Sequence, residues 1–408
     1  MRRLFYSFPI RLWLGVGITA SIPYIILSPW SGMFREHAFI ISMFSVAVTH
    51  WMSAKFIFSI TKYPGHLSPV SVLPNSIFWF GLVWAVLWVL RLPYSLWFLF
   101  IGFLVSFLVC FWGFKIRVSR KAVWAYLPFA KAKYADRIPG AKWIKLDRTI
   151  IPVQSVDGYV VDLHSPDFSP EWQKFLAEET LRGVPVYHIR YIEEMMTGRV
   201  KIHHMYENNL GSLQPSESYM WIKHFLDSIL IVCSLPLIIP LLGFFALLIK
   251  LEDGGAVFYK QKRIGHRGKI ITVYKLRSMR EKSQEYTTYD NDNRITRVGW
   301  LIRKSRIDEI PQFLNVLKGE MSLIGPRAEF KDFADSLEKQ VPFYQYRHIV
   351  KPGISGWAQV MHGYATGAEE TQIKIEHDFY YIKHFSFSLD VLIFFKTIKT
   401  MLTGFGAR

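Results

Sequence analysis

The chain has 408 residues and a net charge of +17 at neutral pH, from 49 Lys and Arg against 32 Asp and Glu. Hydrophobic residues make up 51% and aromatic residues 16% of the sequence, which excludes an intrinsically disordered chain. Only two cysteines are present, so a disulfide scaffold and a cysteine-rich zinc module are excluded too. At about 150 residues per domain, the length predicts two to three folding units.

Apolar residues concentrate in the first 117 positions. Four stretches, at about 11–30, 37–60, 74–92 and 94–116, reach the roughly 20 residues that a membrane-crossing helix needs. Basic residues precede the first stretch and follow the fourth: Arg2, Arg3, Arg11, Lys115, Arg117, Arg120 and Lys121. Because Lys and Arg accumulate in cytoplasmic segments, both ends of this four-helix transmembrane block are expected in the cytosol.

Residues 118–215 have a different character, with charged and turn residues throughout. Short apolar runs at 143–146, 159–163 and 184–189 predict buried strands, and residues 170–182 predict a helix between them. This alternation indicates a small cytosolic α/β domain. We expect it to be a degenerate Rossmann-like domain. No G-x-G-x-x-G is present, so no dinucleotide site is predicted. The pair His203-His204 is interpreted as two polar side chains at the surface rather than as a metal site.

A second apolar segment, residues 225–249, is long enough to cross a membrane. Basic residues lie at both of its ends, which favours the cytosolic side for each. Pro236 and Pro240 at its centre remove amide donors and favour a bend. We therefore predict a re-entrant membrane helix, with a proline-kinked fifth span as the alternative. Asp227 inside this segment needs a partner, and Lys223, one turn earlier, is the nearest one.

Asp308 and Glu309 stand where a helix is predicted to begin. Pro311 is tolerated in a first turn, and the apolar run that follows ends at Gly319. Carboxylates at a helix N-terminus are stabilised as anions, which favours an ionised nucleophile and an ionised metal ligand. Nearby basic side chains are suited to binding phosphate: Arg303, Lys304 and Arg306. The alternative interpretation is simple helix capping.

Residues 221–408 as a whole closely resemble the bacterial polyprenyl-phosphate sugar-1-phosphate transferases, the monotopic phosphoglycosyl transferases. The resemblance is carried by an ordered series of motifs: 223–227, the helix break at Pro240, 258–265, 274–279, 303–312, 315–327 and 351–360. The four predicted spans and the small α/β domain resemble the long-form members. Residues 193–200 look like the usual lead-in to the catalytic part of these proteins.

The resemblance implies a bacterial inner (cytoplasmic) membrane enzyme whose α/β catalytic domain, residues 216–408, faces the cytosol. Such enzymes transfer a sugar 1-phosphate from a UDP-sugar to undecaprenyl phosphate, release UMP and start capsule, exopolysaccharide or O-antigen synthesis. Asp308 corresponds to the nucleophile, Glu309 to a residue that helps to hold Mg²⁺, and Arg303 to a phosphate contact. The expected substrate-binding residues are Lys223, Asp227, Lys275, Arg277, Pro326 and Arg327. Membrane lipid is a further expected partner, nucleic acid is not, and a homodimer stays open.

Three positions depart from the usual family pattern. His224 replaces a common arginine, Ile239 a common serine, and Ala328 a common second proline after Pro326-Arg327. The change at Ala328 leaves the shape of the nucleotide loop open.

Two other functions are weighed. A transporter or polysaccharide-export protein with a regulatory nucleotide-binding domain would need polar residues inside the spans, where His50 is the main one. A catalytically silent scaffold would not need Asp308, Glu309 and Arg303 together. The last helical stretch, 385–405, is either an interfacial helix or a buried core helix.

Overall fold

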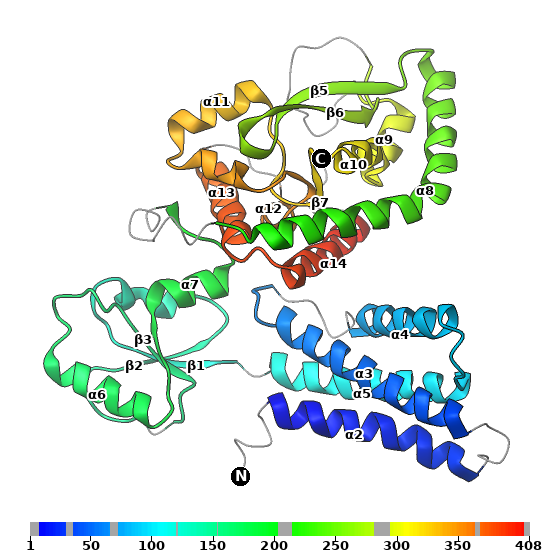
Figure 1. Ribbon diagram of the computed structural model, residues 1–408. Coiled ribbons are helices and arrows are strands. Elements are labelled where there is room, and N and C mark those ends of the chain that lie inside the picture. Colours follow the sequence, from blue (N-terminus) through cyan, green and yellow to red (C-terminus); the bar gives the residue numbers. More distant parts are fainter. Residues whose placement is uncertain are drawn as a thin grey trace. The chain divides into compact units, whose positions relative to one another are not determined.

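The computed structural model describes residues 8–29, 36–65, 72–119, 121–152, 154–202, 214–280, 294–363 and 368–403. It divides into two compact units, Met1–Thr197 and Gly198–Arg408 (Figure 1). Several residues used in the predictions lie outside the described ranges: Arg2, Arg3, Arg120, His203 and His204. The domain limits at 117/118 and 215/216 stay predictions.

The first unit begins with four long apolar helices, α2 (Phe8–Leu27), α3 (Glu36–Ile60), α4 (Val72–Val89) and α5 (Leu96–Ser119). Each is long and apolar enough to cross a membrane. Large apolar side chains such as Trp13, Phe44 and Trp88 are about two-thirds exposed on their outer surfaces. Lipid accommodates such surfaces whereas water does not. The four predicted membrane helices are therefore confirmed.

Hydrogen bonds between side chains connect three of these helices. The Nδ1 atom of His50 on α3 lies 2.9 Å from the Ser106 hydroxyl on α5. Asn75 on α4 donates to the Ser53 hydroxyl on α3 at 2.7 Å. In lipid, such bonds and close packing hold helices together. The spans thus contain more buried polar groups than His50 alone, and these groups serve helix association.

A small parallel sheet follows. Its strands β1 (Val123–Tyr126), β2 (Lys142–Lys145), β3 (Gly158–Val161) and β4 (Val186–His188) lie in the order β2-β1-β3-β4. The same small domain contains helices α6 (Pro170–Leu181) and α7 (Ile189–Thr197) and the 3₁₀ segment η3 (Ala130–Arg137). The predicted small α/β domain is confirmed. Strand β1, although central, is not among the predicted strands.

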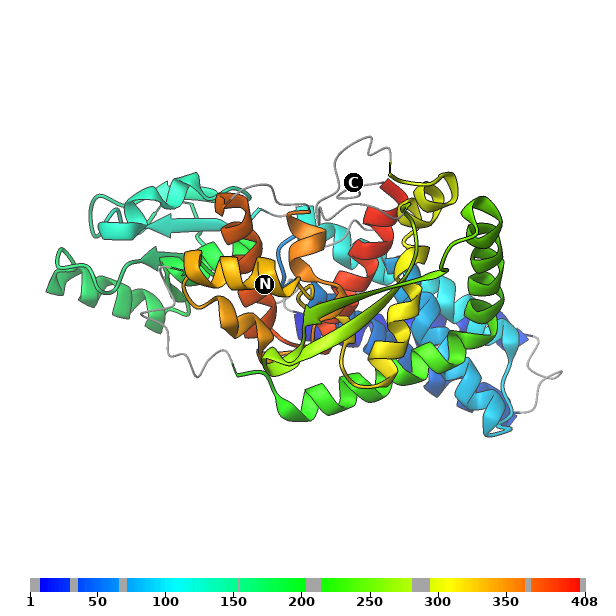
Figure 2. The same cartoon turned by 90° about the horizontal axis from the view of Figure 1, so that it is seen from above.

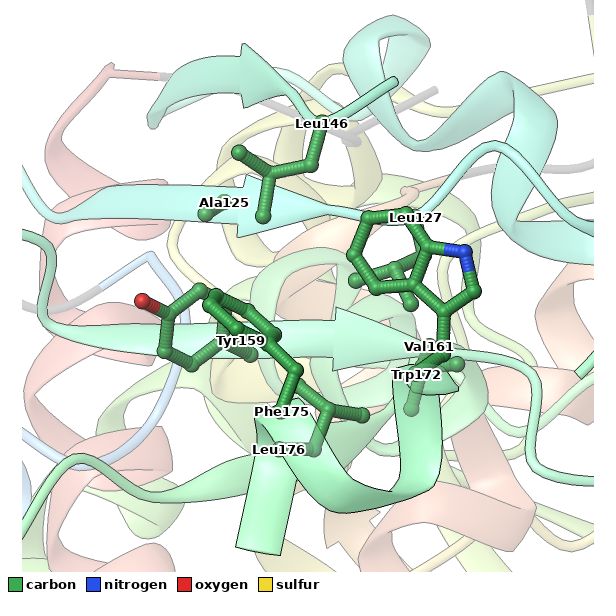
Figure 3. Close-up of a cluster of buried hydrophobic side chains, with 8 residues drawn as sticks. All are labelled: Ala125, Leu127, Leu146, Tyr159, Val161, Trp172, Phe175 and Leu176. Atoms are coloured by element: carbon green, nitrogen blue, oxygen red, sulfur yellow. The ribbon is translucent and has the colours of Figure 1, made fainter. Parts of the chain in front are cut away.

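The core on one face of this sheet is formed with α6. Figure 3 shows Tyr159 and Val161 of β3 facing the α6 side chains of Trp172, Phe175 and Leu176. These side chains are buried. The α6 residues are spaced three and four apart, so one helical stripe covers one face of the sheet.

The second unit starts with one long helix, α8 (Glu217–Asp253), that contains Pro236 and Pro240. Figures 1 and 2 show that its two halves run in different directions. Ile231, before the prolines, packs in one cluster with Val273 and Val316, whereas the later half packs in another. The bend therefore lets one helix cover two parts of the same unit.

The later half of α8 places Phe245 and Ile249 in a cluster with Leu276 and Ile302. On its outer side the helix exposes apolar side chains, of which Leu237 is 79% exposed. This combination of a bend and an apolar outer surface is what a re-entrant membrane helix requires.

The rest of the unit surrounds a two-stranded antiparallel hairpin, β5 (Phe258–Ile264) and β6 (Ile270–Leu276). A second pair, β7 (Ser322–Ile324) and β8 (Gly353–Ser355), is parallel. The remaining elements are η6 (His266–Gly268), α9 (Arg297–Lys304), η7 (Ile307–Gln312), α10 (Phe313–Leu317), α11 (Lys331–Gln340), η8 (Tyr344–Ile349), α12 (Trp357–Met361), α13 (Ala368–Lys383) and α14 (Phe387–Thr403). The α/β nature of the C-terminal part is confirmed.

The predicted lead-in, residues 193–200, is divided between the two units. Residues 193–197 end α7 of the first unit. From residue 198 the chain packs into the second unit: the Gly198 carbonyl accepts hydrogen bonds from Trp357 Nε1 and His377 Nδ1, both at 2.7 Å, and Val200 and Ile202 are buried.

Helix α14 combines both interpretations of the C-terminal stretch. Leu389, Leu392 and Ile393 are fully buried, whereas Phe394 and Ile398 are exposed. One stripe of the helix belongs to the core and another presents apolar side chains to the surroundings.

Candidate active site

Asp308 and Glu309 lie in η7, the tight turn that links α9 to α10. The turn starts after Arg306, whose φ of 58° is left-handed. Both carboxylates are buried. Pro311 is tolerated here because the first amides of a helix lack carbonyl partners. The predicted helix start is confirmed, with a 3₁₀ first turn.

Glu309 is surrounded by basic side chains. Its Oε1 atom accepts a hydrogen bond from Lys275 Nζ at 2.9 Å and another from Arg327 Nη2 at 3.1 Å. Arg306 Nη1 lies 3.8 Å from Oε2. Burial alone would raise the pKa of Glu309, but Lys275 and Arg327 outweigh it and hold the pKa far below its usual range. Glu309 is therefore ionised at any physiological pH.

Asp308 has the opposite environment. Its Oδ1 atom is buried and has no hydrogen-bond partner within the residues that the structure describes. Burial, and next the negative charge of Glu309, raise the pKa of Asp308 to about 6. Burial and a like charge outweigh the helix dipole, so Asp308 ionises less readily than Glu309, but a pKa of about 6 still leaves it mostly ionised at neutral pH. Its unpaired oxygen is available to react.

Arg303 belongs to the last turn of α9, one turn before the two carboxylates. Its Nη1 atom lies 3.4 Å from the sulfur of Met279. The charges of Lys275, Arg303 and Arg306 all act to lower the pKa of Asp308. Three cations thus act on Asp308, although burial prevails.

Lys275 and Arg327 come from separate elements, β6 and the loop after β7. Together with Arg263 and Gln312 they line a recess, which we call the basic recess. Burial lowers the pKa of Lys275, although the charge of Glu309 opposes it. Several cations gathered beside two carboxylates can bind the charged oxygens of a diphosphate.

Lys223 and Asp227 do not pair with each other, so that prediction is wrong. Lys223 Nζ lies 2.7 Å from Asp390 Oδ2 on α14. Asp227 Oδ2 accepts from the Ser322 hydroxyl at 2.6 Å and from the Leu323 amide at 3.1 Å. Helical spacing brings the pair near each other, but tertiary packing offers each a better partner. A second recess, lined by Lys223 with His224 and Lys351, lies at this half of α8.

The other two predicted substrate-binding residues take different places. The guanidinium of Arg277 lies beside Gly255, just after α8. Pro326 contributes its carbonyl, which accepts from the Gly353 amide at 2.9 Å. Pro326 thus shapes the loop that carries Arg327.

Comparisons with known proteins identify the family of this chain. Residues 218–404 match the family model described as bacterial sugar transferase. The whole chain is 45% identical to, and covers 97% of, a UDP-N-acetylgalactosamine-undecaprenyl-phosphate N-acetylgalactosaminephosphotransferase of Aeromonas hydrophila. The chain belongs to the bacterial sugar transferase family. The resemblance inferred from the motifs is thereby confirmed.

Two shorter matches define what this sugar transferase shares with other relatives. The exopolysaccharide production protein PSS of Rhizobium leguminosarum bv. phaseoli is 39% identical over 45% of this chain and 96% of its own length. A UDP-glucose:undecaprenyl-phosphate glucose-1-phosphate transferase of Escherichia coli strain K12 is 38% identical over 42% of this chain and 38% of its own. The Rhizobium protein therefore corresponds to less than half of the present chain.

Sequence reasoning missed three charged residues of this sugar transferase that the structure places around the site. Asp390 pairs with Lys223, Arg263 Nη1 donates to the Ala328 carbonyl, and Arg347 Nη2 donates to the Arg327 carbonyl. Only Asp390 carried a usable signal, since an acid inside an apolar run needs a partner.

The donor set fits a magnesium ion that arrives with substrate phosphates. Among the described residues no group of three or more His, Cys, Asp or Glu would hold a metal by itself. Mg²⁺ is commonly held by one or two carboxylates together with phosphate oxygens and water. Asp308 Oδ1 has unused accepting capacity, and Glu309 Oε2 has only the 3.8 Å contact with Arg306. These two carboxylate oxygens are the ones available to coordinate a metal ion.

Proposed function

We propose that the protein transfers a sugar 1-phosphate from a UDP-sugar to undecaprenyl phosphate, releases UMP and so starts the assembly of a bacterial surface polysaccharide. The observation that carries this proposal is the buried Asp308 oxygen, which has no hydrogen-bond partner in the described part of the chain and lies next to the basic recess. Family membership and the names of the relatives support the substrates.

In the first step a carboxylate oxygen of Asp308 attacks the phosphorus that carries the sugar. The bond from that phosphorus to the oxygen bridging the two phosphates breaks, and UMP leaves with the bridging oxygen. The product is a mixed anhydride of Asp308 with the sugar phosphate. Covalent catalysis of this kind divides one difficult transfer into two easier ones.

In the second step an oxygen of undecaprenyl phosphate attacks the same phosphorus. The bond from phosphorus to Asp308 breaks, the carboxylate is regenerated, and the sugar is left on undecaprenyl diphosphate. The recess lined by Lys223, His224 and Lys351 suits the lipid phosphate. Met321 lines both this recess and the basic recess, so the two phosphates would meet beside it.

The basic side chains would stabilise charge where it develops. Lys275 and Arg327 line the basic recess and would contact the diphosphate of the UDP-sugar. Arg303, in the turn before Asp308, would hold a further phosphate oxygen. Asp227 and Pro326 would act indirectly, since each bonds to the backbone of the β7–β8 pair. Arg277 is proposed only for the outer part of the substrate.

Mg²⁺ is the proposed cofactor. When bound, it would neutralise diphosphate charge so that an anionic nucleophile can approach. Glu309 Oε2 would hold it, which leaves Asp308 Oδ1 to attack, and Lys275 would keep Glu309 in place through Oε1.

The bend of α8 suits an active site at the lipid surface. We propose that α8 is re-entrant at Pro240, that the part after residue 117 faces the cytosol, and that a separate small domain lies within residues 118–215. A cysteine at exposed Lys269 should then be shielded from an impermeant thiol reagent in intact cells. A cysteine at exposed Arg91, between α4 and α5, should be labelled and serves as the control. Labelling at position 269 would contradict the proposal.

The decisive experiment incubates purified membranes with undecaprenyl phosphate, Mg²⁺ and a panel of UDP-sugars, and measures UMP release. UDP-N-acetylgalactosamine is the first sugar to test, because the full-length relative carries it in its name. The Asp308→Asn variant serves as the blank. A wild-type protein that releases no UMP from any sugar would overturn the proposed function.

A further inference from the structure

The loop after β7 is held at three consecutive carbonyls. The Pro326 carbonyl accepts from the Gly353 amide at 2.9 Å, and the Arg327 carbonyl accepts from Arg347 Nη2 at 3.0 Å. The Ala328 carbonyl accepts from Arg263 Nη1. Two of the three donors are buried guanidinium groups. Side chains from distant elements therefore determine the path of this loop.

Arg347 is the most strongly anchored of these donors. Its side chain is 2% exposed, and its Nη2 atom also donates to Asp378 Oδ2 on α13 at 2.7 Å. Its Nη1 atom donates to the Tyr344 hydroxyl at 2.9 Å and lies 3.8 Å from Glu329 Oε1. A buried guanidinium with this many partners has one orientation, because any other would leave charges unpaired.

The network behind Arg347 is anchored on α13. Asp378 and Lys374 both belong to this helix, and Lys374 Nζ lies 2.7 Å from Glu329 Oε1. Glu329 follows Arg327 by two residues, so α13 holds the same loop at Arg327 through Arg347 and at Glu329 through Lys374. The pKa of Glu329 is about 2, because the charges of Lys374 and Arg347 outweigh its burial.

The residue held in this way belongs to the site. The Arg327 carbonyl accepts a hydrogen bond from Arg347, and the Arg327 guanidinium donates to Glu309 Oε1 at 3.1 Å. Arg347 is therefore linked to Glu309 through Arg327 and does not itself contact either carboxylate. We propose that Arg347 is a positioning residue for the reaction: it fixes the Arg327 carbonyl and thereby places the Arg327 guanidinium on Glu309. This inference rests on the proposed function for its catalytic readout only.

The test is a double-mutant cycle on UMP release by the full-length protein in membranes. Arg347→Lys keeps the charge but loses the planar fork, and we expect kcat/KM to fall about 10- to 100-fold. In the Arg327→Met background the same substitution should change kcat/KM less than about threefold, because its effect passes through Arg327. Equal losses in the two backgrounds would overturn the proposal.

Tyr344→Phe is the matched control. It removes a different partner of Arg347 and leaves the bond to the Arg327 carbonyl in place. We expect it to lower the melting temperature, as Arg347→Lys does, but to keep kcat/KM within about threefold of the wild type. If it lowers kcat/KM as much as Arg347→Lys, the role of Arg347 is only structural. Should Arg347→Lys fail to accumulate, Asp378→Asn replaces it in the cycle, with the same expected outcomes.

A cycle on stability separates this proposal from the proposed function, since it needs no substrate. Thermal midpoints are measured for Arg347→Lys, Glu309→Gln and the double variant. If Arg347 places Arg327 on Glu309, the midpoint shift of the double variant is smaller than the sum of the two single shifts. Additive shifts would overturn the positioning role, even for an enzyme that transfers a sugar phosphate.

Discussion

The small α/β domain and the second unit, which contains Asp308 and Glu309, bury acidic side chains in two different ways. In the sheet, Asp162 accepts from the amides of His164 at 3.2 Å and Lys131 at 3.3 Å. Burial raises the pKa of Asp162, but these amide bonds and His188 outweigh it, so the pKa lies below its usual value. In the second unit, Asp308 has a raised pKa and a buried oxygen that is unpartnered among the residues that the structure describes.

The two acids differ in whether the fold uses their charge, and only Asp308 is left with an oxygen for the proposed reaction. Asp162 follows strand β3 and satisfies neighbouring backbone groups, so its charge is fully used by the structure. Asp308 is left with an unsatisfied oxygen beside a like charge, which costs stability and makes the carboxylate available. Stability lost at such a position is typical of functional sites.

The largest expected effect is on the reaction. Asp308→Asn should lower UMP release at least about 1,000-fold with every UDP-sugar, because the nucleophile is lost. Asp162→Asn is the matched control and should leave kcat/KM within about twofold. The assignment of Asp308 as the nucleophile would be contradicted if both variants lost the same share of kcat/KM, or if the Asp308 variant kept its activity.

Glu309→Gln should give the next largest effect. It removes the charge that pairs with Lys275 and Arg327, and breaking a buried ion pair in this way costs about 3 kcal/mol. We also expect the Mg²⁺ concentration for half-maximal UMP release to rise. Glu179→Gln, on α6 of the small α/β domain, should cost about 1 kcal/mol because its Arg182 partner is half-exposed. An unchanged magnesium dependence of the Glu309 variant would refute its role as a ligand.

The two acids should also give opposite pH dependences of stability. A raised folded-state pKa means that the folded protein binds the proton more tightly than the unfolded one. The wild type should therefore lose stability relative to Asp308→Asn as the pH rises from about 4 to 6, by about 3 kcal/mol in total. The measurement is denaturant unfolding without divalent metal, and parallel curves for the two proteins would contradict the prediction.

For Asp162 the sign is reversed. Its folded-state pKa is lowered, so its stabilising contribution is present above the usual value of 3.8 and is lost as the pH falls through the folded pKa. The wild type should lose its advantage over Asp162→Asn below about pH 4. A variant that diverges from the wild type only above pH 5 would contradict the assignment.

The smallest expected effect concerns the hydrogen bond between Tyr159 and Glu179 in the small α/β domain. The Tyr159 hydroxyl donates to Glu179 Oε2 at 2.9 Å inside the domain core. Tyr159→Phe should lower the unfolding free energy of this domain by about 1 kcal/mol and leave UMP release unchanged. Chemical denaturation followed by intrinsic fluorescence provides the measurement, and a loss of activity would show that the sheet contributes to catalysis.

Sequence alone determined the elements whose signals are local. Apolar length predicted α2 to α5, two prolines in an apolar run with basic ends predicted the bend of α8, and the Asp308-Glu309 pair pointed to the site. These features depend on neighbouring residues, so composition and spacing suffice to find them.

Tertiary structure alone decided the partners of the charges. Lys223 pairs with Asp390, 167 residues away, and not with Asp227 one turn on. Glu309 meets Lys275 and Arg327 from two other elements, and these contacts give the two neighbouring carboxylates opposite pKa shifts. Adjacent residues with similar side chains differ in this way because burial and the direction of each side chain depend on packing between segments far apart in the chain.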